Sequence, residues 1–162
     1  MLKYNRANAT KYAGMWALRR NPKYYDFSAI GGDCTNFVSQ CILAGSHVMD
    51  PTKDLGWYYY DVNHRSPSWT SAEFLEQYLT NGTHRAGPVA QKCSAESLEK
   101  GDIVQLSFNG SSFTHSLIVM NVKPEILICA HSDDSFLRKL STYQYKDIRY
   151  LHIIGVTPPT QW

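Results

Sequence analysis

The sequence predicts an α+β fold, with helices in the first half of the chain and an antiparallel sheet in the second. Two observations support this class. Apolar residues recur at helical spacing before residue 45, whereas after residue 101 they alternate or form short apolar runs. Turn signals such as Asn109-Gly110 separate the later segments, as between antiparallel strands. The length of 162 residues predicts one domain, spanning 1–162.

Two helices are predicted near the start of the chain. The first covers residues 5–19 and stops at Asn21-Pro22, because proline cannot continue a helix. A turn at residues 31–33 precedes the second helix, which covers residues 34–44 and carries an apolar stripe. Gly45 suits the position just past its end.

A long loop and a third helix complete the first half. Residues 46–69 show little periodicity and contain Pro51, Gly56 and Pro67, which predicts a loop. The pattern Thr70-Ser71-Ala72-Glu73 matches a capping box, so a helix is expected from there to about residue 80. The loop is expected to shape one wall of a binding cleft.

The second half is predicted to form antiparallel strands. The strand from Thr114 is expected to pair with the next one along the chain, because only a short Lys123-Pro124-Glu125 connection separates them. The predicted strands are residues 102–108, 114–122, 126–130 and 150–156.

Composition excludes several functions. A net charge of +2 is too small to indicate a nucleic-acid partner, and no apolar stretch is long enough to span a membrane. The first residues lack the apolar core of a signal peptide, so the expected location is the cytoplasm, or the cell wall and exterior if a leader has been removed. A monomer is expected. The 13% aromatic content suits either a cleft for sugars and peptides or an aromatic-rich core.

The four cysteines do not form a metal or disulfide pattern. None belongs to a C-x-x-C pair, so a structural zinc site is not expected. Cys34 and Cys41 would lie about 10 Å apart along one helix, which is too far to bridge. Cys41 falls on the apolar stripe, and Cys93 and Cys129 follow no helix start, so these three are interpreted as structural.

Cys34 has the sequence surroundings of a nucleophile. It follows the Gly31-Gly32-Asp33 turn and opens the second predicted helix. The free N–H groups and the dipole of a helix N-terminus are expected to lower the pKa of a thiol and to bind an oxyanion. The two glycines allow a substrate to approach the backbone. A buried cysteine near a helix start is the alternative interpretation.

A thiol nucleophile needs a base, and His115 is the candidate because it begins an apolar strand. The base in turn needs an orienting partner. If the following strand pairs antiparallel, its end lies beside the start of the His115 strand, which predicts His131 as the partner and Asp133 as the second choice. His115, His131 and Asp133 are also metal-ligand types, although no tight spacing supports a metal site. No metal or cofactor is predicted.

The segment from Gly31 to Gln40 resembles the nucleophile segment of the family called "putative amidase domain". The resemblance extends over nearly the whole chain. It includes Tyr4-Asn5-Arg6-Ala7 and Asn21-Pro22-Lys23-Tyr24-Tyr25 in the opening region, and Gly101-Asp102-Ile103-Val104-Gln105 and Thr114-His115-Ser116 later. The family is similar to the papain-like NlpC and CHAP cell-wall hydrolases of bacteria.

The resemblance implies a papain-like fold, with Cys34 as nucleophile, His115 as base and His131 as the third polar residue. It further implies that Asp33 shapes the turn or the site, and that Tyr25 contributes to an oxyanion site. The implied substrates are peptidoglycan peptides or a similar small amide.

These observations predict a cysteine amidase or peptidase. Three alternatives remain open: a transglutaminase-like acyltransferase on the same fold, a catalytically silent module that binds glycan or peptide, and a metal-dependent hydrolase. The presence of Cys34, His115 and His131 together argues against the silent module.

Overall fold

The computed structural model describes residues 1–160, and the predicted domain end at Trp162 lies outside them. The chain forms four α-helices, two short 3-10 helices and eight strands within these residues. The helices are α1 (Arg6–Trp16), α2 (Cys34–Ser46), α3 (Pro67–Thr70), α4 (Ala72–Thr80), η1 (Ala95–Ser97) and η2 (Leu140–Thr142). The strands are β1 (Tyr59–Asp61), β2 (His64–Arg65), β3 (Gly87–Cys93), β4 (Ile103–Ser107), β5 (His115–Asn121), β6 (Leu127–Ala130), β7 (Ser135–Lys139) and β8 (Asp147–Thr157).

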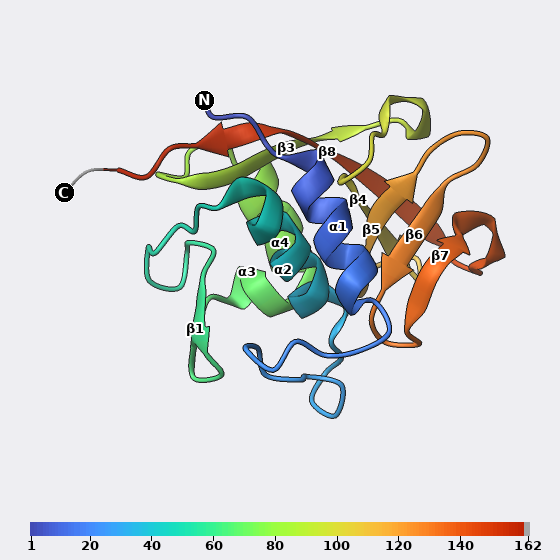
Figure 1. Ribbon diagram of the computed structural model, residues 1–162, viewed down its shortest axis with the longest axis horizontal. Helices are drawn as coiled ribbons and strands as arrows, with labels where there is room; N and C mark the ends of the chain where they lie inside the picture. Colours follow the sequence, from blue (N-terminus) through green and yellow to red (C-terminus); the bar gives the residue numbers. More distant parts are fainter. Residues whose placement is uncertain (161–162) are drawn as a thin grey trace.

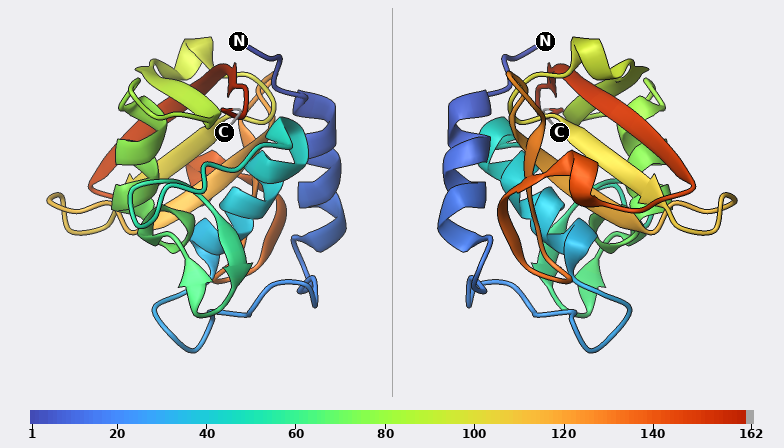
Figure 2. Two further views of the ribbon diagram at one scale, coloured as in Figure 1. Left: turned by 90° about the vertical axis from the view of Figure 1, so that its left-hand side faces the viewer. Right: turned by 90° about the vertical axis from the view of Figure 1, so that its right-hand side faces the viewer.

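Six strands form one antiparallel sheet in the order β3-β8-β4-β5-β6-β7. Helices α1 and α2 lie side by side against one face of this sheet (Figure 1). The connection between them, residues 17–33, runs around one end of the molecule (Figure 2). The α+β class predicted from the sequence is therefore confirmed.

The sheet separates two apolar clusters. The cluster on the helix side includes Phe37 of α2 and Ile118 of β5. The cluster on the opposite side includes Leu117 and Val119 of β5 together with Leu140 of η2. Because side chains alternate across a strand, neighbouring residues of β5 face different clusters, and this alternation decides what each residue near the site can reach.

The second helix extends further than predicted. Gly45 lies inside α2, and the helix ends at His47, which adopts a left-handed conformation with φ 59°. A Cβ on Gly45 would lie only 2.5 Å from the Tyr4 ring and 2.8 Å from the Asn5 carbonyl oxygen. The glycine therefore permits close packing of the N-terminal segment on α2 and does not stop the helix.

The expected loop at residues 46–69 contains the β1–β2 hairpin and, with α3, becomes an ordered, packed segment. Trp57 and Trp69 are fully buried, with ring centroids 4.8 Å apart. Each indole N–H finds a side-chain acceptor on α2, Ser39 for Trp57 and Asn36 for Trp69. Burial of two large aromatic rings orders a segment whose sequence lacks any period.

The cap of the third predicted helix was expected at Thr70, one residue before its actual position. Ser71 caps α4, and its side chain accepts a hydrogen bond from the Phe74 N–H. The predicted strands correspond to β4, β5, β6 and β8, and the pairing of β5 with β6 is confirmed. Strands β3 and β7 were not predicted. No helix of the described residues is long and apolar enough to cross a membrane.

Candidate active site

Cys34 occupies the first position of α2, as predicted, and only 7% of its surface is exposed. The turn before it depends on two glycines with positive φ, 80° at Gly31 and 100° at Gly32. L-residues with side chains rarely adopt these angles, so the Gly31-Gly32 pair allows the chain to turn sharply into the helix.

The thiol of Cys34 lies against the start of β5. Its Sγ is 3.5 Å from the carbonyl oxygen of Thr114 and 3.8 Å from the hydroxyl of Thr35. The Thr35 hydroxyl is in turn 2.9 Å from that of Ser116. A carbonyl oxygen can only accept, so the contact with Thr114 requires the S–H form of Cys34.

Burial raises the pKa of the Cys34 thiol above its ordinary value. Hydrogen bonds from the backbone N–H of Ser116 and from Thr35 favour the thiolate, but their effect is smaller. The expectation of a lowered pKa was therefore wrong for this structure, because desolvation outweighs the helix N-terminus. Cys34 rests as a neutral thiol.

Asp33 precedes the thiol but does not face the substrate side. Its carboxylate is fully buried and makes no capping bond to α2. It accepts hydrogen bonds from the Phe27 N–H at 2.8 Å and the Asn36 side chain at 2.9 Å, and lies 2.6 Å from Nδ1 of His131. Asp33 thus shapes the turn before Cys34, and its carboxylate is not placed to bind an oxyanion.

Both ring nitrogens of His131 are engaged away from His115. Nδ1 contacts the Asp33 carboxylate, and Nε2 lies 2.7 Å from the carbonyl oxygen of Trp16. The ring also stacks on Phe37 with centroids 4.0 Å apart. The Trp16 carbonyl oxygen can only accept, so Nε2 donates to it, and Nδ1 forms a buried, hydrogen-bonded pair with the Asp33 carboxyl.

The expectation that His131 lies next to His115 was wrong, and strand register explains why. In the β5–β6 ladder Ile118 pairs with Cys129. Continuing this register places His131 opposite Ser116, and paired residues point to the same face of a sheet. His131 therefore faces the helices, whereas His115 shares the opposite face with Leu117.

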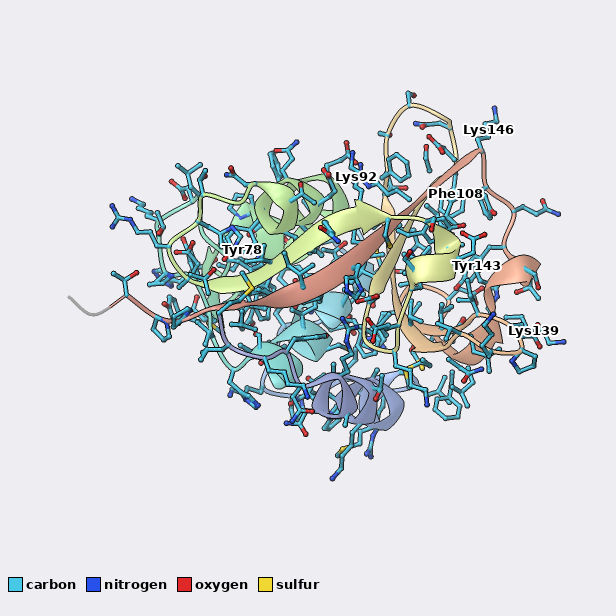
Figure 3. All side chains as sticks on the ribbon, turned by 90° about the horizontal axis from the view of Figure 1, so that it is seen from above. Tyr78, Lys92, Phe108, Lys139, Tyr143 and Lys146 are labelled. Atoms are coloured by element: carbon cyan, nitrogen blue, oxygen red, sulfur yellow. The ribbon has the colours of Figure 1, made fainter. Side chains whose placement is uncertain are left out.

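His115 begins β5 and is 7% exposed, and its imidazole makes no hydrogen bond to any other residue within 1–160. Its ring contacts two aromatic rings, Phe108 at 6.0 Å and Tyr143 at 5.8 Å between centroids. Figure 3 shows these two residues together at one end of the sheet. The pKa of His115 is lowered to about 4, mainly by burial and secondly by the Arg138 charge, while the Asp133 charge opposes the shift.

Cys34 and His115 line the same pocket, which has a volume of about 480 Å³. No hydrogen bond joins the thiol to the imidazole within the part of the chain that the structure describes. The pocket lies at the end of the sheet, where the start of β5 meets the turn before α2. Its lining residues are Gly31, Gly32, Cys34, Phe108, Thr114, His115, Ser132, Asp133, Arg138 and Tyr143.

The turn after β6 forms the rim of this pocket. Ser132 and Asp133 both adopt positive φ, 64° and 65°, which is uncommon for residues with side chains. The Ser132 hydroxyl accepts a hydrogen bond from the Asp33 N–H at 3.2 Å. Asp133, the second choice for the orienting residue, lines the pocket together with His115, whereas His131 does not.

Tyr25 does not line the pocket. Its side chain is 41% exposed and packs edge-on against Phe27, with centroids 4.9 Å apart. Its backbone N–H donates to the Tyr59 hydroxyl, and its carbonyl oxygen accepts from the Asn36 side chain. The structure places Tyr25 in the support of the turn, so its expected part in an oxyanion site was wrong.

Sequence reasoning assigned no role to Asn36 and did not single out Phe108, Arg138 or Tyr143. Asn36 holds Asp33 and accepts a hydrogen bond from the Trp69 indole. Its position three residues after Asp33, one helical turn on, was a signal that could have identified this contact. The other three come from separate elements, and no sequence pattern joins them.

A larger hollow of about 710 Å³ lies elsewhere, around Arg6, Glu99 and His152. It has no cysteine or serine among its lining residues. Asp102 there is fully buried and holds Arg6 at 2.7 Å and His152 at 2.8 Å, which fastens the N-terminal segment to β8. Within residues 1–160, no group of three or more His, Cys, Asp or Glu residues is placed to hold a metal ion.

A comparison against protein families assigns the chain to one of them. Residues 3–154 match the family described as "Putative amidase domain", so the chain belongs to this family, whose name indicates hydrolysis of amide bonds. Among curated proteins it is similar to the uncharacterized protein YhbB of Bacillus subtilis (strain 168), with 36% identity over 165 residues. The match covers 95% of this chain and 51% of YhbB, so the chain spans about half the length of that relative. No solved structure matches.

Proposed function

We propose that the protein is a cysteine-dependent amide hydrolase with a papain-like arrangement, in which Cys34 is the nucleophile and His115 the base. The observation that carries this proposal is the shared pocket: a thiol at the first turn of a helix and an imidazole without a hydrogen-bond partner line the same hollow. Membership of the amidase family supports the reaction class.

The resting charges indicate general-base activation of a neutral thiol. At neutral pH a His115 with a pKa of about 4 is unprotonated and can accept a proton, while Cys34 retains its own. No side-chain hydrogen bond within residues 1–160 occupies the imidazole, so no such bond has to break before His115 takes the thiol proton. Proton transfer then accompanies attack, and no preformed ion pair is needed.

In the first step, the Cys34 sulfur forms a bond to the amide carbon as His115 takes the thiol proton. The backbone N–H groups at the first turn of α2 have no intrahelical partners, and those of Cys34 and Thr35 are available to the oxyanion. The carbon–nitrogen bond then breaks and His115 returns the proton to the leaving amine. Water, deprotonated by His115, hydrolyses the thioester and releases the carboxylate product.

Asp133 takes the orienting role in this proposal. Its charge favours the protonated form of His115, which the base must become during the reaction. The buried His131–Asp33 pair acts one step further away, because it holds the turn that positions Cys34.

The substrates we propose are peptides of the peptidoglycan stem or similar small amides, cleaved by a monomer without a metal ion. The test is the release of new amino groups from a panel of purified stem peptides, with wild type, Cys34→Ala and a chelator-treated sample. Chelator-resistant release that disappears in Cys34→Ala is expected. Undiminished release in Cys34→Ala contradicts the cysteine mechanism, and no release from any peptide contradicts the substrate class.

A silent binding module is the second candidate, because no hydrogen bond joins the thiol and imidazole in residues 1–160 and burial raises the pKa of Cys34. Measurable binding of the same peptides without cleavage favours this function. Adding a free amine distinguishes the acyltransferase from the hydrolase. An acyltransferase would join the amine to the acyl group, whereas a hydrolase would release the free acid.

A further inference from the structure

Arg138 stands out among the residues that line the pocket because its side chain is held in place there. It projects from β7, its Nε donates to the Thr142 hydroxyl at 2.8 Å, and its Nη2 donates to the Thr142 carbonyl oxygen at 3.4 Å. The guanidinium also lies 3.7 Å from the centroid of the Tyr143 ring. A cation immobilised by two hydrogen bonds and a ring loses little further entropy when it binds a ligand.

The ion pair that Arg138 forms in the structure is weak. Asp133 lies 3.4 Å from its Nη1, and the Asp133 side chain is 91% exposed. An ion pair of this kind contributes little, because water competes for both groups. Of the other nearby acids, Asp134 is held by Arg20 at 2.8 and 3.0 Å. The guanidinium fork of Arg138 therefore remains able to exchange Asp133 for another anion.

Tyr143 supports the guanidinium of Arg138 from one side of the pocket. Its ring faces the Arg138 charge, and its buried hydroxyl lies beside Ser135 and Arg138, which oppose the rise in its pKa that burial causes. Because this hydroxyl is covered, the Arg138 fork is the group that offers itself to a planar ligand with two acceptor oxygens.

We propose that Arg138 is a specificity-determining residue that binds a carboxylate of the substrate, so that the preferred amides carry a free carboxylate close to the bond that Cys34 attacks. This inference rests on the proposed function, because it takes Cys34 as the reacting atom. Arg138 reaches the pocket from β7, the strand beside β6, and lines it together with Cys34 and His115.

The proposed contact would also tune the base. The positive charge of Arg138 lowers the pKa of His115, second only to burial, and Asp133 opposes it. A substrate carboxylate bound to Arg138 adds a negative charge that favours protonated His115. An acidic substrate would thus make His115 a stronger proton acceptor as it binds.

The test uses two alkylating reagents that differ only in charge: iodoacetate, which carries a carboxylate, and neutral iodoacetamide. Both form a carbon–sulfur bond with the cysteine and release iodide. Peptide mass spectrometry gives the rate at Cys34 and, as an internal reference, at the half-buried Cys93 on β3. The ratio of the two rates cancels differences in thiol reactivity.

In Arg138→Gln we expect the iodoacetate-to-iodoacetamide ratio at Cys34 to fall about tenfold, as for loss of one charge-assisted hydrogen bond, with no change at Cys93. The matched control is Lys139→Gln, which removes the same charge from the next residue of β7, where the side chain faces Glu125 and is 60% exposed. This control should keep the wild-type ratio. An Arg138→Lys variant, which keeps the charge but loses the fork, should give an intermediate ratio.

An unchanged ratio in Arg138→Gln, or an equal fall in Lys139→Gln, overturns the proposal. If Arg138→Gln does not fold, as judged by its thermal unfolding, the Arg138→Lys ratio decides: a value equal to wild type overturns carboxylate recognition by the fork. The outcome is separate from that of the hydrolase proposal. A fall in the ratio without any peptide cleavage would support the anion site and contradict the hydrolase.

Discussion

His115 begins β5 and His131 directly follows the adjacent strand β6, at the same end of the sheet, yet the two occupy opposite chemical environments. His131 has both nitrogens bound, to Asp33 and to the Trp16 carbonyl oxygen, and its ring stacks on Phe37. The imidazole of His115 has no hydrogen bond within residues 1–160, and His115 lines a pocket with Cys34. Both are nearly inaccessible to solvent, so burial alone does not distinguish them.

The comparison teaches that available hydrogen-bonding capacity identifies the reactive histidine here. A histidine whose two nitrogens are both held in hydrogen bonds has no lone pair free to take a proton. A neutral histidine without bonds retains that lone pair. We therefore expect loss of His131 to reduce stability and loss of His115 to reduce activity.

The largest effect is expected from His115→Ala. Removal of the base should lower kcat by about 10²–10⁴-fold. The lost packing against Phe108 and Tyr143 should cost about 1–3 kcal/mol of unfolding free energy, less than the loss for His131→Ala, because no side-chain hydrogen bond to another described residue is lost. Peptide cleavage and urea unfolding measure the two quantities. His64→Ala is the control, since His64 is exposed on the β1–β2 hairpin and pairs with Asp61. Unchanged kcat in His115→Ala would show that His115 is not the general base.

The next largest effect is expected from His131→Ala. It removes the closest partner of the buried Asp33 carboxyl, which keeps only Arg20, at 3.5 Å, as a charged partner, and leaves the Trp16 carbonyl oxygen without a donor. The loss should cost about 3–5 kcal/mol of unfolding free energy. Urea unfolding at neutral pH measures the loss. A cost below about 1 kcal/mol would show that the pair does not hold the turn before Cys34.

The pH dependence sharpens the same comparison. The pKa of His115 is lowered to about 4 in the folded protein, below the ordinary value of 6.5, so the unfolded chain binds more protons between these values. Stability from this residue is full above pH 6.5 and is lost as the pH falls toward 4, by about 3 kcal/mol. The difference between wild type and His115→Gln in urea unfolding at several pH values isolates this contribution. Equal pH slopes in the two proteins would contradict it.

The smallest effects are expected at two helical glycines remote from the pocket. Gly45→Ala places a Cβ against Tyr4 and Asn5 and should cost about 1–3 kcal/mol. Gly14→Ala meets only Phe136, at an ordinary 3.8 Å, and should gain about 0.5–1 kcal/mol because alanine favours a helix. Neither should alter kcat. A loss of kcat in Gly45→Ala would mean that stability and activity are coupled through α2.

Local patterns predicted the elements that carry the site. The glycine turn, the start of α2 at Cys34 and the start of β5 at His115 depend on neighbouring residues, and all three were predicted correctly. The antiparallel pairing of β5 with β6 also followed from a short connection. What the sequence could not provide was the exact register, and a shift by one residue moved His131 to the other face.

The elements missed from the sequence depend on distant contacts. Strand β3 starts with Gly87-Pro88, which reads as a turn, and pairing with β8 imposes the strand. Strand β7 contains Leu137 with φ 53°, and β6 supplies its only partner among the described residues. Arg138, on this unpredicted strand, could not be placed in the pocket from sequence. The raised pKa of Cys34 likewise results from burial that no local pattern reports.

The central claim is that Cys34 is acylated during turnover with His115 as its base. Acid-quenched mass spectrometry on the protein during cleavage of a stem peptide tests it most directly. The account predicts an adduct with the mass of the peptide's acyl part on the fragment that contains Cys34, with slower formation in His115→Ala. Cleavage that proceeds at the wild-type rate in Cys34→Ala, without any such adduct in the wild type, would contradict the claim.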